Sequence, residues 1–526
     1  MTTPDASSGD ARSRGDLEQA AVSGARWITL ARIAAEVVLF ATLVVLAHLI
    51  PPAAFGRYAI VVFMTELSVG VIGGFGQALV QRPSIDLSHQ RAAMAIVMLI
   101  QGTLVVATWL VLAPYVIDPI FGHQTADLVK IASPAFLLAG LMTVPQAMLQ
   151  RRLDFRRLGQ LQVASTLASA AVQLGLATAL DLDAEALVLG TVAGTAVACL
   201  VAVPSAPPPL PRLGRGAGKE LSTYGTPAAI AAISWAGFRN VDYAIVGARL
   251  GAASAGIYWR AFQLAVEYQK KISVIVYQVA FPVLARAASV EDMLALRLRM
   301  VRLLTLLVFP LLAGLVALAP TVVPFVFGDE WDAAVGPTQV LAIAGAATLV
   351  IDAVGATLMA TGRARAMLGY GWAHFAVYAG VVLAVSSHGI MWVASAAAAV
   401  HVVFLVVAYY VLLHGRPERP LRHVWDDVAP ALIGSLALVA VAFPVRMGLD
   451  DAGLPAAVVI LVVGVASVPA YLLAVRVLFP AIWRENAPLV ARMVPARLRR
   501  RPPVAPPVPE PVAEPGSAPA PEALVG

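Results

Sequence analysis

The chain has 526 residues, of which 60% are hydrophobic and only 13% are charged, and its mean hydropathy is +0.81. A soluble protein of this length could not bury so much apolar surface, so the composition excludes that class. The formal charge of +6 lies in short segments between apolar stretches and does not indicate nucleic-acid binding. Cys199 is the only cysteine and the eight histidines show no ligand spacing, so no disulfide, metal or cofactor is expected.

Long apolar stretches follow one another along most of the chain. A helix needs about 20 apolar residues to cross a bilayer, and in lipid every backbone polar group must be paired within the segment. The short alternating segments of a membrane β-barrel are absent. We therefore predict an all-α polytopic membrane protein with about 14 transmembrane helices. They are placed near 22–50, 58–80, 92–117, 126–149, 158–180, 184–203, 223–248, 256–284, 300–323, 335–361, 367–386, 390–413, 426–446 and 454–478.

The chain also repeats itself at a distance of about 200 residues, the length of one helical domain. Ala47-His-Leu-Ile-Pro-Pro-Ala-Ala-Phe-Gly-Arg-Tyr58 and Ala248-Arg-Leu-Gly-Ala-Ala-Ser-Ala-Gly-Ile-Tyr258 both end in Gly-x-Tyr, and Phe121-Gly122 has a counterpart in Phe327-Gly328. We therefore predict two pseudo-symmetric six-helix lobes followed by two extra helices. The predicted organisation is a cytoplasmic segment 1–21, an N-lobe 22–203, a cytoplasmic linker 204–222, a C-lobe 223–413, two helices within 426–478, and a Pro-rich disordered cytoplasmic tail 484–526.

Arginine is concentrated in every second gap between the predicted spans, whereas the alternate gaps contain only Arg57, Arg249 and Arg446. By the positive-inside rule the arginine-rich side is cytoplasmic, which places both termini there. Arg32 and Glu36 interrupt the first apolar stretch, so it is predicted to be a retained helix and not a signal peptide. A bacterial cytoplasmic membrane is the expected location.

Ionisable residues inside the spans gather in the first two helices of each predicted lobe. Each costs about 2.5–3.5 kcal/mol to insert, so such residues usually face a cavity or a partner. We expect a hydrated, net-positive cavity between the lobes. The candidate substrate-binding cations are Arg32, Arg239, Arg260 and Lys271, and the candidate acids, which would hold these cations or exchange protons, are Glu36, Glu66, Asp242 and Glu267. Structural ion pairs, or positions near the membrane interface, are the alternative.

Three spacings support this grouping. Arg32 precedes Glu36 by four residues and Arg239 precedes Asp242 by three, distances at which side chains on one helix can pair. On an uninterrupted α-helix, Arg260, Glu267 and Lys271 would share one face.

No catalytic constellation stands out. Gly214-Arg-Gly-Ala-Gly-Lys219 is one residue short of a phosphate-binding loop, and Glu220 occupies the position where such a loop needs Ser or Thr. The loops on the predicted outer side are short, whereas a membrane glycosyltransferase usually needs a long loop for its catalytic acid. The sequence therefore favours transport over catalysis.

The chain resembles the polysaccharide transporter, or Wzx-like oligosaccharide flippase, family of the multidrug/oligosaccharidyl-lipid/polysaccharide exporter superfamily, over about 22–480. Arg239, Asp242 and Arg260 match the family pattern, whereas His48, Pro52 and Ala53 depart from it. The segments that carry the resemblance are Ala47–Tyr58, Gly76-Gln-Ala-Leu-Val-Gln-Arg82, Pro145-Gln-Ala-Met-Leu-Gln-Arg-Arg-Leu-Asp-Phe155, Arg239-Asn-Val-Asp242, Gly256-Ile-Tyr-Trp-Arg260 and Phe327-Gly-Asp-Glu-Trp331.

The resemblance implies a flippase that moves a polyprenyl-pyrophosphate-linked oligosaccharide across the cytoplasmic membrane by alternating access, for cell-surface or exopolysaccharide synthesis. It implies lipid partners and makes polysaccharide polymerase or assembly proteins candidate partners. The alternatives are a cation-coupled small-molecule exporter of the same superfamily, a peptidoglycan-precursor flippase and a membrane glycosyltransferase. The sequence does not identify the glycan or the coupling ion.

Overall fold

The computed structural model describes residues 30–267, 290–415 and 419–485, together with Trp27, Gln269, Lys271 and Pro417. Within these ranges the elements are helices and helical turns, and none is a strand, so the all-α prediction is confirmed. The predicted segment 1–21 and nearly all of the predicted tail lie outside the described residues.

Twelve helices in the described part of the chain are long and apolar enough to cross a membrane, which makes this a multi-pass membrane protein. The predicted count of 14 is not confirmed. The predicted seventh span falls in α9, which is not among the twelve, and the predicted eighth span runs into residues outside the described ranges. The elements are Leu30–Leu49, α2 (Pro52–Gln81), α3 (Leu87–Ala107), η1 (Thr108–Ile117), α4 (Asp118–Phe121), α5 (His123–Ala132), α6 (Pro134–Arg151), α7 (Phe155–Ala179), α8 (Ala184–Ser205), α9 (Arg215–Leu250), α10 (Ala252–Phe262), η2 (Gln263–Glu267), α12 (Val290–Phe327), η3 (Asp329–Ala334), α13 (Val335–Ala360), α14 (Ala364–Val385), η4 (Ser386–His388), α15 (Ile390–Leu412), α16 (Pro420–Asp451) and α17 (Ala456–Leu478).

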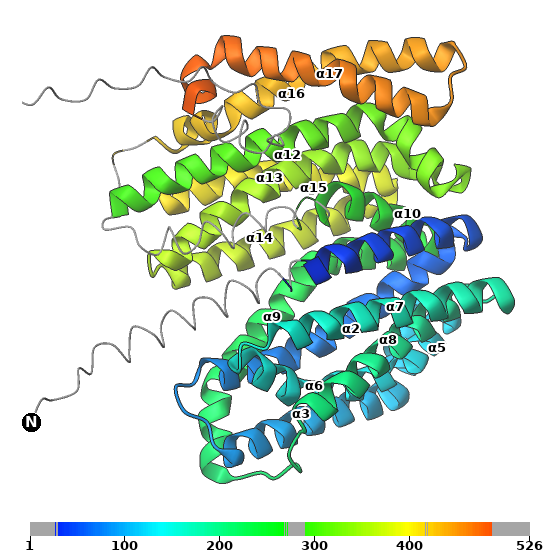
Figure 1. Ribbon diagram of the computed structural model, residues 1–526, viewed down its shortest axis with the longest axis vertical. Helices are drawn as coiled ribbons and strands as arrows, with labels where there is room; N and C mark the ends of the chain where they lie inside the picture. Colours follow the sequence, from blue (N-terminus) through cyan, green and yellow to red (C-terminus); the bar gives the residue numbers. More distant parts are fainter. Residues whose placement is uncertain are drawn as a thin grey trace, which may run out of the picture.

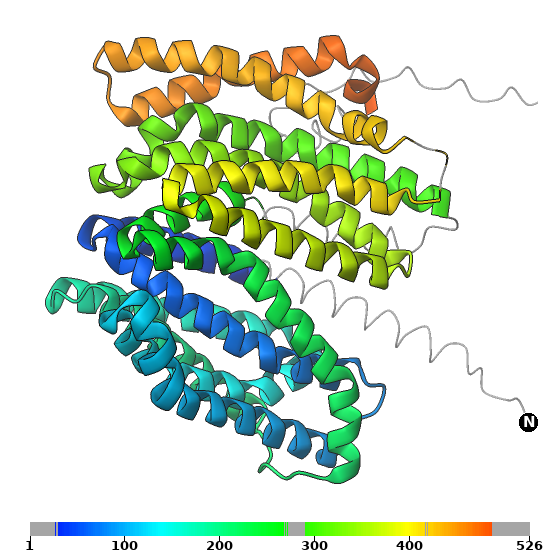
Figure 2. The same cartoon turned by 180° about the vertical axis from the view of Figure 1, so that it is seen from behind.

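The helices form two groups that lie side by side (Figures 1 and 2). Helices α2 to α8 make the first group and α12 to α17 the second, and α9, α10 and Leu30–Leu49 lie where the groups meet. The largest buried apolar cluster contains residues of both groups. Helices α16 and α17 lie at the edge of the second group against α12, and the three helices share an apolar cluster. Two groups with two further helices at one edge are the arrangement that the sequence predicted, and the predicted domain boundaries stay a prediction.

The repeated Gly-x-Tyr segments form a close contact between α2 and α10. A Cβ atom on Gly56 would lie 1.8 Å from the carbonyl oxygen of Ala252, and a Cβ on Gly256 would lie 1.9 Å from that of Pro52. Only glycine allows α2 and α10 to approach so closely. The other repeated pair, Gly122 and Gly328, has φ of 85° and 96° in the turns before α5 and η3. Both repeats seen in the sequence therefore have a structural counterpart.

A buried ion pair attaches α16 to the second lobe. Arg297 Nη1 lies 3.0 Å from Asp427 Oδ2, and the two side chains are 3% and 0% exposed. The hydroxyl of Tyr409 on α15 contacts both partners. Because an isolated buried charge is costly, this pairing fixes α12, α15 and α16 relative to one another.

Candidate functional site

A cavity of about 200 Å³ lies where α2 and α9 meet α10 and η2. Four of the eight candidate residues line it, namely Glu66, Arg239, Glu267 and Lys271. We call it the interlobe cavity, and its lining residues are Val62, Glu66, Arg239, Asn240, Tyr243, Trp259, Phe262, Gln263, Glu267 and Lys271.

The cations of this cavity contact carboxylates from other helices. Arg239 Nη2 lies 2.9 Å from Glu267 Oε2, and these side chains are 30% and 21% exposed. Lys271 forms an ion pair with Glu36 of the helix Leu30–Leu49. The described lining thus contains two cations and two carboxylates, and not the net positive charge that the sequence led us to expect.

The predicted pairs within single helices are not formed. Glu36 pairs with Lys271, and the exposed Arg32 has no ion pair or hydrogen bond with any described residue. Arg239 pairs with Glu267, and Asp242 binds tyrosines. Glu36, Arg239 and Asp242 thus each contact a side chain from another segment of the chain.

Arg260 lies outside the interlobe cavity. Its side chain is fully buried, with the guanidinium carbon 4.6 to 5.5 Å from the centres of four aromatic rings, and its Nη1 donates to Gln263 Oε1 at 2.8 Å. Aromatic faces stabilise a cation at such distances. The rings are those of Phe55, Trp259, Phe327 and Trp331.

The expected common face of Arg260, Glu267 and Lys271 is therefore wrong, and the reason is local. Helix α10 ends at Phe262 and continues as the π-helical turn η2. A π turn adds a residue and rotates everything after it, so Glu267 faces the cavity while Arg260 faces the aromatic rings.

Asp242 is also fully buried and does not line the interlobe cavity. Its carboxylate accepts hydrogen bonds from the hydroxyls of Tyr258 at 2.9 Å and Tyr378 at 2.7 Å, and from the backbone N–H of Tyr243 at 2.9 Å. These contacts join α9, α10 and α14. The sequence analysis did not single out Tyr378, although it did find Tyr258 in the repeated Gly-x-Tyr segment.

Asn240 is a further residue that the sequence analysis did not assign to the site. Its Nδ2 donates to Glu66 Oε2 at 3.0 Å, which connects α9 to α2 at the wall of the interlobe cavity. Its position in the sequence could have indicated a role in the site, since Asn240 lies between the two charged residues of Arg239-Asn-Val-Asp242.

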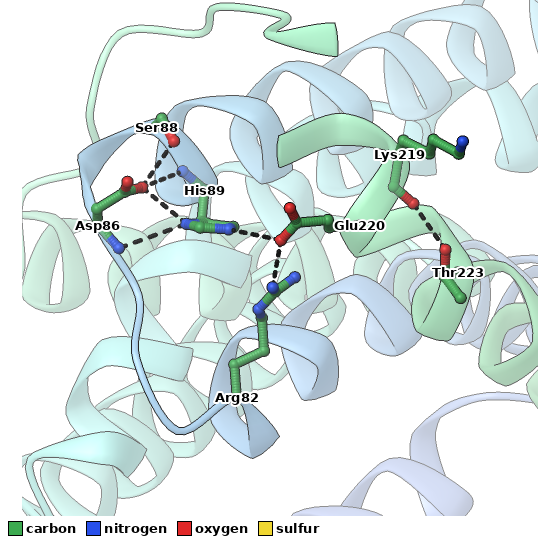
Figure 3. Close-up of polar contacts among 7 residues, drawn as sticks. All are labelled: Arg82, Asp86, Ser88, His89, Lys219, Glu220 and Thr223. Carbon is green, nitrogen blue, oxygen red and sulfur yellow. Dashed lines mark hydrogen bonds and ion pairs between the residues drawn. The ribbon is translucent and has the colours of Figure 1, made fainter. Parts of the chain in front are cut away.

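A polar network connects the α2–α3 turn to the start of α9 (Figure 3). Glu220 Oε2 contacts Arg82 and lies 3.2 Å from His89 Nε2, while His89 Nδ1 lies 2.7 Å from Asp86 Oδ1. Hydrogen bonds from Ser88 and His89 lower the pKa of Asp86, and those from His89 and Arg82 lower the pKa of Glu220. Residues 215–219 are the first turns of α9, so the glycine-rich segment is part of a helix and not a phosphate loop.

Among the described residues, no group of three or more His, Cys, Asp or Glu side chains is placed to hold a metal ion. The chemistry available in the interlobe cavity is charge pairing and hydrogen bonding between helices.

The fold is similar to those of solved flippase and multidrug transporter structures. The lipid II flippase MurJ, in an inward closed conformation, is similar with a TM-score of 0.69 at 12% identity, covering 88% of this chain and 99% of that one. An inward-facing multidrug resistance MATE transporter of the MOP superfamily has a TM-score of 0.58 at 12% identity, covering 72% and 94%. At these identities the likeness concerns the fold.

The family described as Polysaccharide biosynthesis protein matches residues 45–336, more than half of the chain, and the chain belongs to this family. The teichuronic acid biosynthesis protein TuaB of Bacillus subtilis is 26% identical over 348 residues, which are 65% of this chain and 72% of that protein. The lipopolysaccharide biosynthesis protein WzxC of Escherichia coli is 25% identical over 368 residues, 66% of this chain and 71% of that protein. The resemblance to Wzx-like polysaccharide transporters is confirmed.

Proposed function

We propose that this protein is a flippase that moves a polyprenyl-pyrophosphate-linked oligosaccharide across the cytoplasmic membrane by alternating access. The observation that carries the proposal is the interlobe cavity, in which Arg239 and Lys271 lie between the two lobes of a membrane protein of a polysaccharide biosynthesis family. The product would serve cell-surface or exopolysaccharide synthesis, and a polysaccharide polymerase is the kind of partner that would receive it.

The ion pairs of the interlobe cavity suggest how the headgroup binds. Glu267 and Glu36 hold Arg239 and Lys271 in the structure, and the oxygens of a pyrophosphate would replace those carboxylates. A guanidinium binds such oxygens through two parallel hydrogen bonds and stays charged. The released carboxylates are then sites where protons can bind, which would link headgroup movement to a proton gradient. The lipid tail stays in the bilayer throughout.

The distribution of arginine supports an orientation with both termini in the cytoplasm. Reporter tags at the two chain ends test this part of the proposal. Tags found on opposite sides of the membrane would overturn it.

The proposed function is tested in proteoliposomes with a fluorescent polyprenyl-pyrophosphate oligosaccharide. We expect the double variant Arg239→Ala/Lys271→Ala to flip this probe about 10–100-fold more slowly than the wild type, the effect of losing one or two charge-assisted hydrogen bonds. Arg446→Ala is the matched control, because Arg446 pairs with Asp450 on α16 away from the cavity. Flipping at the wild-type rate by the double variant would remove these residues from the mechanism.

Two carboxylates on the described lining, Glu66 and Glu267, favour a second candidate, a cation-coupled exporter of small cationic molecules. Efflux of a cationic dye from cells that lack their own exporters distinguishes the two. Dye efflux without flipping of the glycan lipid would support this second candidate. Flipping of a peptidoglycan precursor in place of the oligosaccharide would keep the mechanism and change the cargo.

A further inference from the structure

A second cavity, of about 280 Å³, lies inside the first lobe between α2, α6 and α8. None of its lining residues is charged. We call it the amide cavity, and its polar or open positions include Thr65, Gly73, Gln77, Gln146, Gln150 and Thr195.

The glutamines of the amide cavity differ from the buried glutamines of this lobe. The side chains of Gln77, Gln146 and Gln150 make no hydrogen bond with any described residue. By contrast, Gln101 accepts from the Ser68 hydroxyl at 2.8 Å and donates to the Ser68 carbonyl oxygen at 3.2 Å, so its amide is used on both sides. The buried amide of Gln101 is thus paired within the protein, whereas the exposed Gln77 and the half-buried Gln146 and Gln150 keep their amides accessible to water or a ligand.

The chemistry of this lining selects one class of ligand. Each carboxamide presents an acceptor oxygen and a donor NH₂ group, which match the hydroxyls of a sugar. An anionic group would find no cation here, because the nearby Arg151 donates to the backbone carbonyls of Leu79, Val80 and Pro83. An acyl chain would strip water from three amides without replacing their hydrogen bonds. A neutral saccharide fits best.

Helix α2 connects the amide cavity to the interlobe cavity. Val62 and Glu66 lie on its interlobe face, whereas the stripe from Thr65 to Gln77 faces the amide cavity. That stripe is about 18 Å long, at 1.5 Å per residue. A ligand with an anionic end and a neutral polar body could occupy both sites across one helix.

We propose that the amide cavity binds neutral sugar units of the lipid-linked glycan while the cations of the interlobe cavity bind its pyrophosphate. This inference rests on the proposed function and adds a site that binds the sugar part of the substrate. The space beside Gly73 is open, because a Cβ atom there would meet nothing within 4 Å. A larger side chain at this position would therefore fill the cavity without a clash.

The test compares two probes in proteoliposomes, a polyprenyl pyrophosphate carrying one N-acetylhexosamine and one carrying a neutral pentasaccharide. We expect Gly73→Leu, and separately Gln77→Leu/Gln146→Leu, to slow flipping of the pentasaccharide probe by about tenfold, the effect of losing one or two hydrogen bonds. Flipping of the monosaccharide probe should stay near the wild-type rate. Gly175→Leu on α7 is the matched control, since Gly175 is exposed, open and outside the cavity.

The outcomes separate this inference from the proposed function. If the wild type flips both probes and each variant changes the two flipping rates by the same factor, the amide cavity is not a sugar site and the flippase proposal stands. If the wild type flips neither probe, the proposed function itself fails.

A binding readout covers the case in which a variant folds poorly. Gln146→Cys in a Cys199→Ala background is labelled with a maleimide, and Cys199 is the only cysteine to be removed. Protection by the pentasaccharide probe but not by polyprenyl pyrophosphate supports the sugar site. Equal protection by both, or by neither, overturns it.

Discussion

Helices α2 and α10 take part in two regions, one of which buries a cation while the other leaves a cation partly exposed. Where the helices begin, Gly56 and Gly256 touch and Arg260 is enclosed by aromatic rings; we call this region the sealed contact. About 15 Å further along α2, at Glu66, the same helices diverge and line the interlobe cavity, where Arg239 is 30% exposed.

From this difference we infer that Arg260 serves the structure and Arg239 serves binding. Arg260 is surrounded by aromatic rings and donates to the amide of Gln263, so replacing it should affect folding. Arg239 is held by a carboxylate that a substrate anion can displace, so replacing it should affect transport. Three of the four predictions that follow test this contrast, and the fourth concerns the network of Figure 3.

The largest effect is expected at the sealed contact itself. Gly256→Leu would force a side chain onto the backbone of Pro52, where even a Cβ atom would lie 1.9 Å from the carbonyl oxygen. We expect the free energy of unfolding to fall by about 3 kcal/mol, or folded protein to be lost. Thermal unfolding in detergent measures this. Gly102→Leu on α3 is the control, because a Cβ there meets nothing within 4 Å, and equal unfolding temperatures would refute the tight contact.

A smaller effect is expected for the enclosed cation. Arg260→Ala leaves a void among aromatic rings and should lower the free energy of unfolding by about 2 kcal/mol. Arg260→Met refills that volume and should restore most of the stability, with flipping near the wild-type rate. Arg239→Met should unfold like the wild type yet flip slowly. Slow flipping by a stable Arg260→Met protein would show that this guanidinium binds substrate after all.

A third prediction concerns the carboxylate that competes with the substrate. Glu267→Gln removes the negative partner of Arg239, a pair that is only partly buried. Because such pairs are worth about 0.2–1 kcal/mol, affinity for the pyrophosphate probe should rise by up to about fivefold. Release of the probe should slow in parallel. Asp450→Asn frees Arg446 in the same way on α16 and should change neither quantity, and lower affinity in Glu267→Gln would argue against competition.

The smallest effect is expected at the network of Figure 3, which is largely exposed. The pKa values of Glu220 and Asp86 are lowered in the folded protein, so these carboxylates add stability above their ordinary pKa of about 4. That stability is lost only as pH falls through the lower folded-state values. The unfolding temperature of Glu220→Gln should therefore lie below that of the wild type above about pH 5, and converge with it at lower pH.

Salt provides the check on this last prediction. The difference between the wild type and Glu220→Gln should shrink at high ionic strength, because exposed charges are screened. A difference that grows as the pH falls below about 4 would contradict the assigned direction of the pKa shift.

Much of the fold was accessible from the sequence because hydropathy and charge alternation are local properties. The apolar stretches predicted the helices, and the Gly-x-Tyr and Phe-Gly repeats predicted two related lobes. The segments that carry the family resemblance also proved informative, since Phe55, Arg260 and Trp331 from three of them meet at the sealed contact.

The partners of the charged residues were decided only by the tertiary structure. Spacing along one helix predicted an ion pair between Arg239 and Asp242. In the structure α9 packs against α10 and α14, so that Asp242 accepts hydrogen bonds from tyrosines and Arg239 pairs with Glu267. The π turn after Phe262 rotated Glu267 away from Arg260 by an amount that composition does not reveal. The amide cavity likewise exists because α2, α6 and α8 leave space beside Gly73. Packing between segments that are distant in the sequence decides which helices cross and at which residues. A local sequence pattern therefore does not predict these crossings.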